Sequence, residues 1–289
     1  MLLSGHSAAV TGAAFSPDGA RFVTYSLDGS ALLWDASGLF LARLIGHPAE
    51  SRESFSAQQS GSPAARAFFD GDGSRVLAVA GDGTAYLWDA HAATLLAALA
   101  GHPSGKITVA FGAGRTLADT RIVTIGPDRT PRLWNGATGS LIATLKGHTE
   151  QILSATFSPD GALLVTTSAD QTARLWDARD GRLLALLNGH SNWVQSAAFS
   201  PDGAHLVTAS WDGSARLWSA RPATVAAALP VASGRVRAAA ISPDGRTLAY
   251  GGDDGQVYWW DIGDDAAPIA LRGFAASVNR VRFSADGAW

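Results

Sequence analysis

A tryptophan that returns at nearly constant spacing is the feature of this sequence that most restricts its fold. Six such residues are separated by 54, 46, 42, 42 and 42 positions, and they are Trp34, Trp88, Trp134, Trp176, Trp218 and Trp260. Self-similarity with a period of about 40–45 residues is typical of proteins built from copies of one small structural unit. The sequence therefore predicts a repeat architecture in which each copy packs on its neighbours.

Each copy combines a tight turn with short strands. In five copies the tryptophan follows an apolar residue by 19 positions, and in the third copy it follows Phe111 by 23. Four of the apolar residues precede Ser-Pro-Asp-Gly, which favours a turn. In the stretch 168–177, a second turn precedes a strand whose neighbours Leu175 and Trp176 point to opposite faces. No stretch has the 3.6-residue spacing of an amphipathic helix, so we expect an all-β fold.

Two dipeptides accompany the tryptophan. Gly-His recurs at residues 5–6, 46–47, 101–102, 147–148 and 189–190, and Trp-Asp at residues 34–35, 88–89, 176–177 and 260–261. With these motifs the chain resembles the WD-repeat, or WD40, family over essentially its whole length, and it resembles the repeat arrays of bacterial proteins. The departures are local, since Asn135 and Ser219 replace the aspartate and residues 231–232 and 273–274 lack Gly-His.

The resemblance implies one all-β propeller domain over residues 1–289, with about seven four-stranded blades. The expected blades cover residues 6–46, 47–100, 101–146, 147–188, 189–231 and 232–272, with a partial blade at 273–289 plus 1–5. Because this last blade lacks the strand that carries tryptophan, we interpret the sequence as a fragment of a longer chain. A complete ring that closes imperfectly is the alternative.

Composition excludes several classes of site. The chain has no cysteine, so disulfides, thiolate catalysis and zinc–sulfur sites are ruled out. A net charge of −3 argues against nucleic acid as a partner. No signal peptide or long apolar stretch is present, so we expect no membrane association and a cytoplasmic location. We also expect no cofactor and no metal, and the oligomeric state stays open.

Serine, histidine and aspartate recur together and suggest a hydrolase. An aspartate stands six residues before each tryptophan, and in three copies a serine stands two residues before that aspartate. Catalysis needs one activated serine beside one oxyanion hole, whereas this set recurs in three copies. No Gly-x-Ser-x-Gly motif accompanies the set. We therefore expect no catalytic residues.

The family resemblance implies a structural role for the same residues, namely a hydrogen-bonded chain from tryptophan through serine and histidine to aspartate. The expected members are His6, Ser26, Asp28, Trp34, His148, Ser168, Asp170, Trp176, His190, Ser210, Asp212 and Trp218. Such a chain satisfies half-buried polar groups. Copies two, three and six carry Ala80, Gly126 and Gly252 in place of the serine, and we expect packing to hold them.

Residues just before the turn aspartate, and those three after the histidine position, should share one rim in this family. Their chemistry varies while the framework repeats, as expected of a binding surface. We predict partner-binding residues there, namely Trp193, Trp211, Arg235, Arg237, Asp253 and Gln151. The alternative is that both tryptophans simply pack on the rim as part of the repeat.

Four other segments invite a functional interpretation. The stretch 50–65 is about 13 residues longer than its counterparts and is either a lid that grips a partner or an inert insertion. The extra residues at 112–119 should project from the opposite rim. Residues 101–106 resemble a phosphate loop one residue too short, and residues 70–73 resemble a calcium loop without its closing glutamate.

The sequence thus favours a non-catalytic scaffold that binds a protein or peptide along one rim. Two alternatives stay open. The chain could be the sensor or regulatory segment of a larger bacterial signalling protein, which rests on family analogy. It could also be a ligand-binding or enzymatic propeller, which would need a central cluster of acid, base or metal groups.

Overall fold

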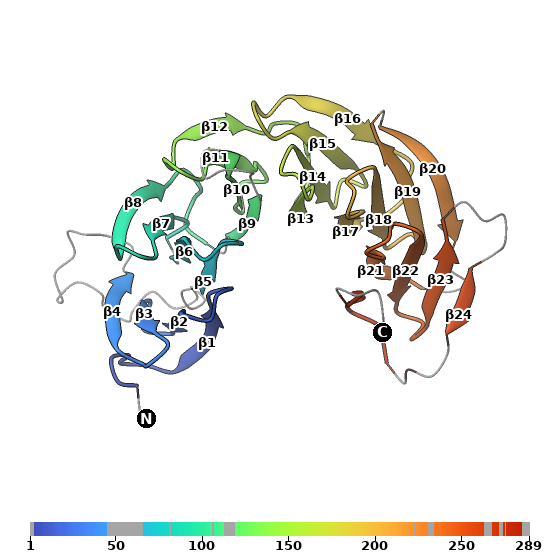
Figure 1. The fold of residues 1–289 in the computed structure, drawn as a ribbon. Helices are drawn as coiled ribbons and strands as arrows, with labels where there is room; N and C mark the ends of the chain where they lie inside the picture. Colours follow the sequence, from blue (N-terminus) through green and yellow to red (C-terminus); the bar gives the residue numbers. More distant parts are fainter. Residues whose placement is uncertain are drawn as a thin grey trace. The chain divides into compact units, whose positions relative to one another are not determined.

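The described part of the chain forms six four-stranded antiparallel sheets, each made of four consecutive strands (Figure 1). The computed structural model describes residues 3–44, 66–80, 82–105, 107–112, 119–221, 223–230, 234–262, 268–271, 274 and 276–284. Its strand order is sequential within every sheet, which is a propeller-like blade organisation. The predicted all-β class with repeated four-stranded units is confirmed.

The first three sheets contain twelve short strands. Sheet one contains β1 (Val10–Phe15), β2 (Arg21–Ser26), β3 (Ala31–Asp35) and β4 (Phe40–Leu44). Sheet two contains β5 (Arg66–Phe69), β6 (Arg75–Val79), β7 (Ala85–Asp89) and β8 (Thr94–Leu99). Sheet three contains β9 (Thr108–Gly112), β10 (Arg121–Ile125), β11 (Arg132–Asn135) and β12 (Leu141–Thr144).

The last three sheets repeat the pattern. Sheet four contains β13 (Ile152–Phe157), β14 (Leu163–Ser168), β15 (Ala173–Asp177) and β16 (Leu183–Leu187). Sheet five contains β17 (Val194–Phe199), β18 (His205–Ser210), β19 (Ser214–Ala220) and β20 (Ala223–Pro230). Sheet six contains β21 (Val236–Ile241), β22 (Thr247–Gly252), β23 (Val257–Asp261) and β24 (Ile269–Leu271).

The chain forms two compact units. The first comprises Met1–Ala113, Leu117–Asp128 and Trp134–Leu141, and the second comprises Gly114–Thr116, Arg129–Leu133 and Ile142–Trp289. Sheets one and two belong to the first unit, and sheets four, five and six belong to the second. The division into blades of a single propeller domain stays a prediction.

The Ser-Pro-Asp-Gly motif forms the turn between the first two strands of a sheet. In sheet four, the Ser158 hydroxyl donates to Asp160 Oδ1 at 2.6 Å and accepts the backbone N–H of Leu163 at 2.9 Å. Gly161 has a φ of 68°, a left-handed conformation that glycine adopts without strain. The motif therefore fixes the hairpin through its own side chains.

Neighbouring sheets in the second unit pack face to face through alternate residues of the third strand. In sheet five, Leu217 belongs to the core shared with sheet six, whereas Trp218 belongs to the core shared with sheet four. The register shifts between these two residues, where β19 pairs with β20. The prediction that the tryptophan and its preceding leucine face opposite ways is therefore correct.

The first unit has the same construction. One core joins sheets one and two around Val23, Leu33 and Val76, and a second joins sheets two and three around Leu87, Ile122 and Trp134. These side chains are buried, so sheet two is covered on both faces. Burial on both faces explains why large apolar residues appear at consecutive positions of one strand.

Residues 276–284 follow sheet six without forming a strand in the described part of the chain. The backbone N–H of Val278 donates to the carbonyl of Gly252 at 2.8 Å, and the ring of Phe283 lies 5.5 Å from that of Trp259. The segment thus packs on sheet six. A partial seventh blade at 273–289 stays a prediction.

Two predicted insertions lie outside the described residues, namely the stretch 50–65 and most of the stretch 112–119. Among the residues that the structure describes, no helix has the length and apolar character needed to cross a membrane.

Candidate functional site

A hydrogen-bonded chain runs along the face of sheet five that carries Trp218. The indole N–H of Trp218 donates to the hydroxyl of Thr208 at 3.0 Å, and that oxygen lies 2.8 Å from Nε2 of His190. The other ring nitrogen, Nδ1, lies 2.8 Å from Asp212 Oδ2. The His190 side chain is fully buried, so the chain links the core of the sheet to the turn that carries Asp212.

Protonation in this chain follows from its surroundings. Burial would raise the pKa of Asp212, but hydrogen bonds from Ser214, His190 and the Ser191 backbone outweigh it and lower the pKa to about 2. Burial lowers the pKa of His190, although Asp212 opposes the shift. The imidazole is therefore neutral at pH 7 and donates its Nδ1 proton to the carboxylate. Its Nε2 then accepts the hydroxyl proton of Thr208.

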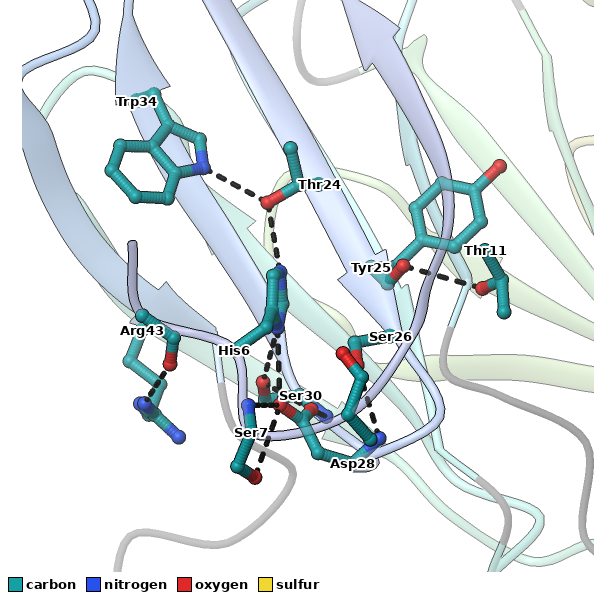
Figure 2. A network of polar contacts seen from close by, with 12 residues as sticks. His6, Ser7, Thr11, Thr24, Tyr25, Ser26, Asp28, Ser30, Trp34 and Arg43 are labelled. Carbon is teal, nitrogen blue, oxygen red and sulfur yellow. Dashed lines mark hydrogen bonds and ion pairs between the residues drawn. The ribbon is translucent and has the colours of Figure 1, made fainter. Parts of the chain in front are cut away.

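The same chain recurs in three other sheets. The tryptophan N–H donates to a threonine hydroxyl at 2.9 Å in each, and the hydroxyl lies 2.8–2.9 Å from histidine Nε2. The members are His6, Thr24, Asp28 and Trp34 in sheet one (Figure 2), His102, Thr124, Asp128 and Trp134 in sheet three, and His148, Thr166, Asp170 and Trp176 in sheet four. Hydrogen bonds outweigh burial and lower the pKa of Asp28 to about 2, and they lower that of Asp170 as well.

The predicted position of serine in the chain is wrong. Ser26, Ser168 and Ser210 do not join tryptophan to histidine. Each hydroxyl accepts the backbone N–H of the turn aspartate at 3.0–3.1 Å and donates to a carbonyl 18 residues earlier. The register gives the reason. Trp218 pairs with Leu206, so Thr208 lies diagonally opposite on the same face, while Ser210 lies two residues farther along.

This geometry also bears on the hydrolase interpretation. A serine nucleophile needs a hydrogen bond to its histidine base. In sheets one, four and five the serine hydroxyl donates to a backbone carbonyl, and the histidine Nε2 lies beside threonine. The recurring set is therefore arranged as a structural chain, with the serine capping the turn.

Sheet three corrects a second expectation, because it contains the full chain although Gly126 replaces the serine. A Cβ atom at residue 126 would come within 2.4 Å of Nδ1 of His102. Glycine here gives room to the imidazole, which bonds Thr124 and Asp128 at 2.8 Å each. The four sheets with the chain share the threonine, and the chain does not need the serine.

Sheets two and six have no threonine at this position. Ala78 occupies it in sheet two, and the indole N–H of Trp88 finds no acceptor among the described residues. Tyr250 occupies it in sheet six and stacks on Tyr258 at 5.2 Å between ring centroids. The Tyr258 hydroxyl donates to Asp254 Oδ2 at 2.7 Å, so a tyrosine anchors the turn aspartate there.

Backbone hydrogen bonds bring the predicted rim residues together in pairs. The residue before the turn aspartate donates its N–H to the carbonyl of the residue three after the histidine position, and we call these two residues a rim pair. The pairs are Ala9 and Leu27, Gln151 and Ala169, Trp193 and Trp211, and Arg235 and Asp253, at 2.9–3.0 Å. Each sheet with a described rim pair thus presents two variable side chains side by side.

The rim pairs of sheets five and six form one cluster. Trp193 stacks on Trp211 with ring centroids 4.5 Å apart and planes 19° apart. The guanidinium of Arg235 lies over the Trp211 ring, 4.2 Å from its centroid. Asp253 accepts a hydrogen bond from Nε of Arg237 and lies 3.9 Å from Nε of Arg235. We call these five residues the rim cluster.

Gln151 lies on sheet four, at the position that Trp193 occupies in sheet five, and it is exposed. Its carbonyl accepts the N–H of Ala169. The structure therefore places five of the six predicted partner-binding residues in contact and the sixth at the equivalent position of the neighbouring sheet. Their binding role stays a prediction.

No group of three or more histidine or acidic side chains is arranged to hold a metal ion in the part of the chain that the structure describes. Asp70 and Asp72 lie in the turn of sheet two that corresponds to Ser-Pro-Asp-Gly elsewhere. Their carboxylates accept N–H groups of Arg75 and Ser74 within that turn. The pair therefore serves the hairpin.

Comparison with known proteins agrees with this geometry. The family model "WD domain, G-beta repeat" matches residues 1–35, 139–177, 181–219 and 227–261, which together make up just over half of the chain. No curated protein matches the sequence. On the matched segments and the repeated four-stranded sheets, the chain belongs to the WD40 repeat family.

Proposed function

We propose that this chain is a non-catalytic scaffold that binds a protein or peptide partner through the rim cluster of sheets five and six. WD40 repeats in general indicate a protein-interaction scaffold. The finer assignment of a surface rests on one observation, the contact of Trp193, Trp211 and Arg235 at an exposed rim. Tryptophan and arginine are the residues most often found at the energetic centre of protein interfaces.

The repeat itself does not require these side chains. The same rim positions hold Ala9 and Leu27 in sheet one, and Gln151 and Ala169 in sheet four. The indole N–H of Trp211 is buried without an acceptor among the described residues, which costs stability instead of adding to it. Trp193 is 39 % exposed, although it is large and apolar. A binding role explains a side chain that the fold does not need.

Neighbouring groups hold the cluster in place before any partner arrives. The Asn192 side chain accepts the N–H of Trp193 at 2.8 Å and donates to the carbonyl of Trp211 at 3.4 Å. Asp253 fixes Arg237, and Arg235 rests on the Trp211 ring. Preorganised side chains lose less conformational entropy on binding, so the surface is suited to recognition.

Selection from a random peptide library on the immobilised full chain tests the proposal. Recovered peptides are then measured by fluorescence anisotropy against the Trp193→Ala chain and against Leu27→Ala, which removes an exposed side chain at a rim position of sheet one. We expect Trp193→Ala to weaken binding by about tenfold or more, and Leu27→Ala to leave it unchanged. Equal affinity for all three chains would rule the surface out.

Two further predictions complete the proposal. The alternative role, a sensor segment of a larger signalling protein, predicts an adjoining catalytic or switch domain in the parent gene. The cytoplasmic location predicts that a tagged chain fractionates with cytoplasmic enzymes. Neither affects the assignment of the surface.

A further inference from the structure

The layering of the rim cluster leaves one aromatic face open. Trp193 and the Arg235 guanidinium both contact the Trp211 ring, at 4.5 Å between ring centroids and 4.2 Å to the ring centroid. One face of Trp193 lies on Trp211, while its other face has no ring stacked on it among the described residues. A planar side chain from a partner can stack on that face.

The charges of the cluster do not balance. It contains the guanidinium groups of Arg235 and Arg237 but only one carboxylate, that of Asp253. Asp253 is hydrogen-bonded to Arg237, and its 3.9 Å separation from Arg235 is too long for a direct hydrogen bond. The Arg235 side chain is 49 % exposed, so its N–H groups are accessible to an acceptor from outside.

Nearby acidic residues are hydrogen-bonded to other groups and make no described hydrogen bond to Arg235. Asp212 is bonded to His190, Ser191 and Ser214, and its side chain is almost fully buried. Asp254 accepts the hydroxyl of Tyr258. The cluster therefore combines an aromatic platform with an exposed guanidinium whose N–H groups can pair with a carboxylate from a partner.

We infer that the rim cluster recognises short peptide segments that combine a carboxylate with an aromatic side chain. The carboxylate pairs with Arg235, and the aromatic ring stacks on the open face of Trp193. Because Trp193 and Arg235 both contact the Trp211 ring, the acidic and aromatic residues should be about two to four positions apart in an extended segment. This inference rests on the proposed function and names the chemistry of the partner.

The test uses the peptides recovered on the full chain from a 12-residue display library. We expect an acidic residue and an aromatic residue to be enriched at that spacing. For each such peptide, the acidic residue is changed to its amide and the affinity is measured with the wild-type chain and with Arg235→Gln. Arg221→Gln is the matched control, since Arg221 is an exposed arginine of sheet five outside the cluster.

Arg235→Gln should weaken the acidic peptide by about fivefold or more and have little effect on its amide version, and Arg221→Gln should leave both unchanged. Peptides that depend on Trp193 but lack the acidic residue, or that are insensitive to Arg235→Gln, would overturn the inference and leave the proposed surface intact. Peptides that are insensitive to Trp193→Ala would overturn both. The variant chains are compared by thermal melting first, so that loss of fold is not read as loss of contact.

Discussion

Sheets five and six both hold their turn aspartate in place, but with different side chains. In sheet five, His190 anchors the turn residue Asp212 and passes the connection through Thr208 to Trp218. In sheet six, Tyr258 donates directly to Asp254, and Tyr250 fills the space at the threonine position. The turn aspartate is common to both, whereas its partner differs. The fold therefore requires an anchored turn and a filled interior, and it does not require one particular donor.

The residue two positions before the tryptophan also differs between the two sheets. Arg216 of sheet five, two residues before Trp218, donates to the carbonyl of Gly189 in the Gly-His pair at 2.7 Å. Sheet six lacks Gly-His, and the equivalent residue is Tyr258. The replacement of arginine by tyrosine and the loss of Gly-His therefore occur together in sheet six. The rim pairs differ as well, since sheet five has Trp193 and Trp211 and sheet six has Arg235 and Asp253. At these positions the fold does not restrict the type of side chain.

Removing His190, which anchors the turn of sheet five, should have the largest effect on stability. We expect His190→Ala to lower the free energy of unfolding by about 2–4 kcal/mol, because it leaves a cavity and strands the hydroxyl of Thr208 and the carboxylate of Asp212. Urea unfolding followed by circular dichroism measures this. The matched control is His205→Ala in the same sheet, whose ring makes no described hydrogen bond. Equal losses for the two variants would contradict a structural role for His190.

Breaking the middle of the chain should cost somewhat less. Thr208→Val keeps the volume but removes the acceptor of the Trp218 N–H, with an expected loss of about 1–3 kcal/mol. In NMR spectra the Trp218 indole proton should shift and exchange faster with solvent. Ser210→Ala should leave that proton in place, since the described hydrogen bonds of the Ser210 hydroxyl go to the turn and to the carbonyl of Asn192. A shift of the indole proton in Ser210→Ala but not in Thr208→Val would instead support a chain that runs through the serine.

Acidification should act on sheet five through two groups. His190 has a lowered pKa in the folded chain, so the unfolded chain binds more protons and stability falls as the pH drops below about 6.5. The pKa of Asp212 is lowered to about 2, so its contribution is lost between about pH 4 and pH 2. The contribution of Asp212 is roughly 1–2 kcal/mol after solvent screening. Urea midpoints from pH 7.5 to pH 5 should fall for the wild type and fall less for His190→Gln. Parallel curves would contradict this.

The smallest effects should come from sheet six. Tyr258→Phe removes one hydrogen bond to Asp254 and should cost about 1 kcal/mol. Tyr250→Phe removes a buried hydroxyl that has no partner among the described residues, so it should be neutral or slightly stabilising. Chemical unfolding of both variants gives the comparison. A larger loss for Tyr250→Phe would mean that its hydroxyl is bonded after all.

The periodic residues predicted much of the fold. The spacing of the tryptophans and the Ser-Pro-Asp-Gly turns predicted repeated units of short strands, and the family resemblance implied four strands in each unit, as observed. The threonine of the hydrogen-bonded chain was missed because threonine is an ordinary strand residue. One signal was available, since a threonine precedes the tryptophan by ten residues in four of the six copies.

The rim could be predicted only in part. The two positions of a rim pair follow from the repeat, so Trp193 and Trp211 could be placed together. The position of Arg235 over the Trp211 ring depends on how sheet six packs against sheet five, which the sequence of one repeat does not determine. The pairing of Asp253 with Arg237 depends on the same packing.

Our central claim is that the repeated residues stabilise the fold whereas the variable rim residues bind a partner. Peptide affinity and thermal stability measured together on Thr208→Val and Trp193→Ala test it most directly. Thr208→Val should lower the melting temperature and, below that temperature, keep the affinity of the wild type. Trp193→Ala should leave the melting temperature unchanged and lower the affinity for the peptide by about tenfold. If Thr208→Val weakens binding in the intact fold, or if Trp193→Ala unfolds the chain without affecting affinity, the division between framework and rim is contradicted.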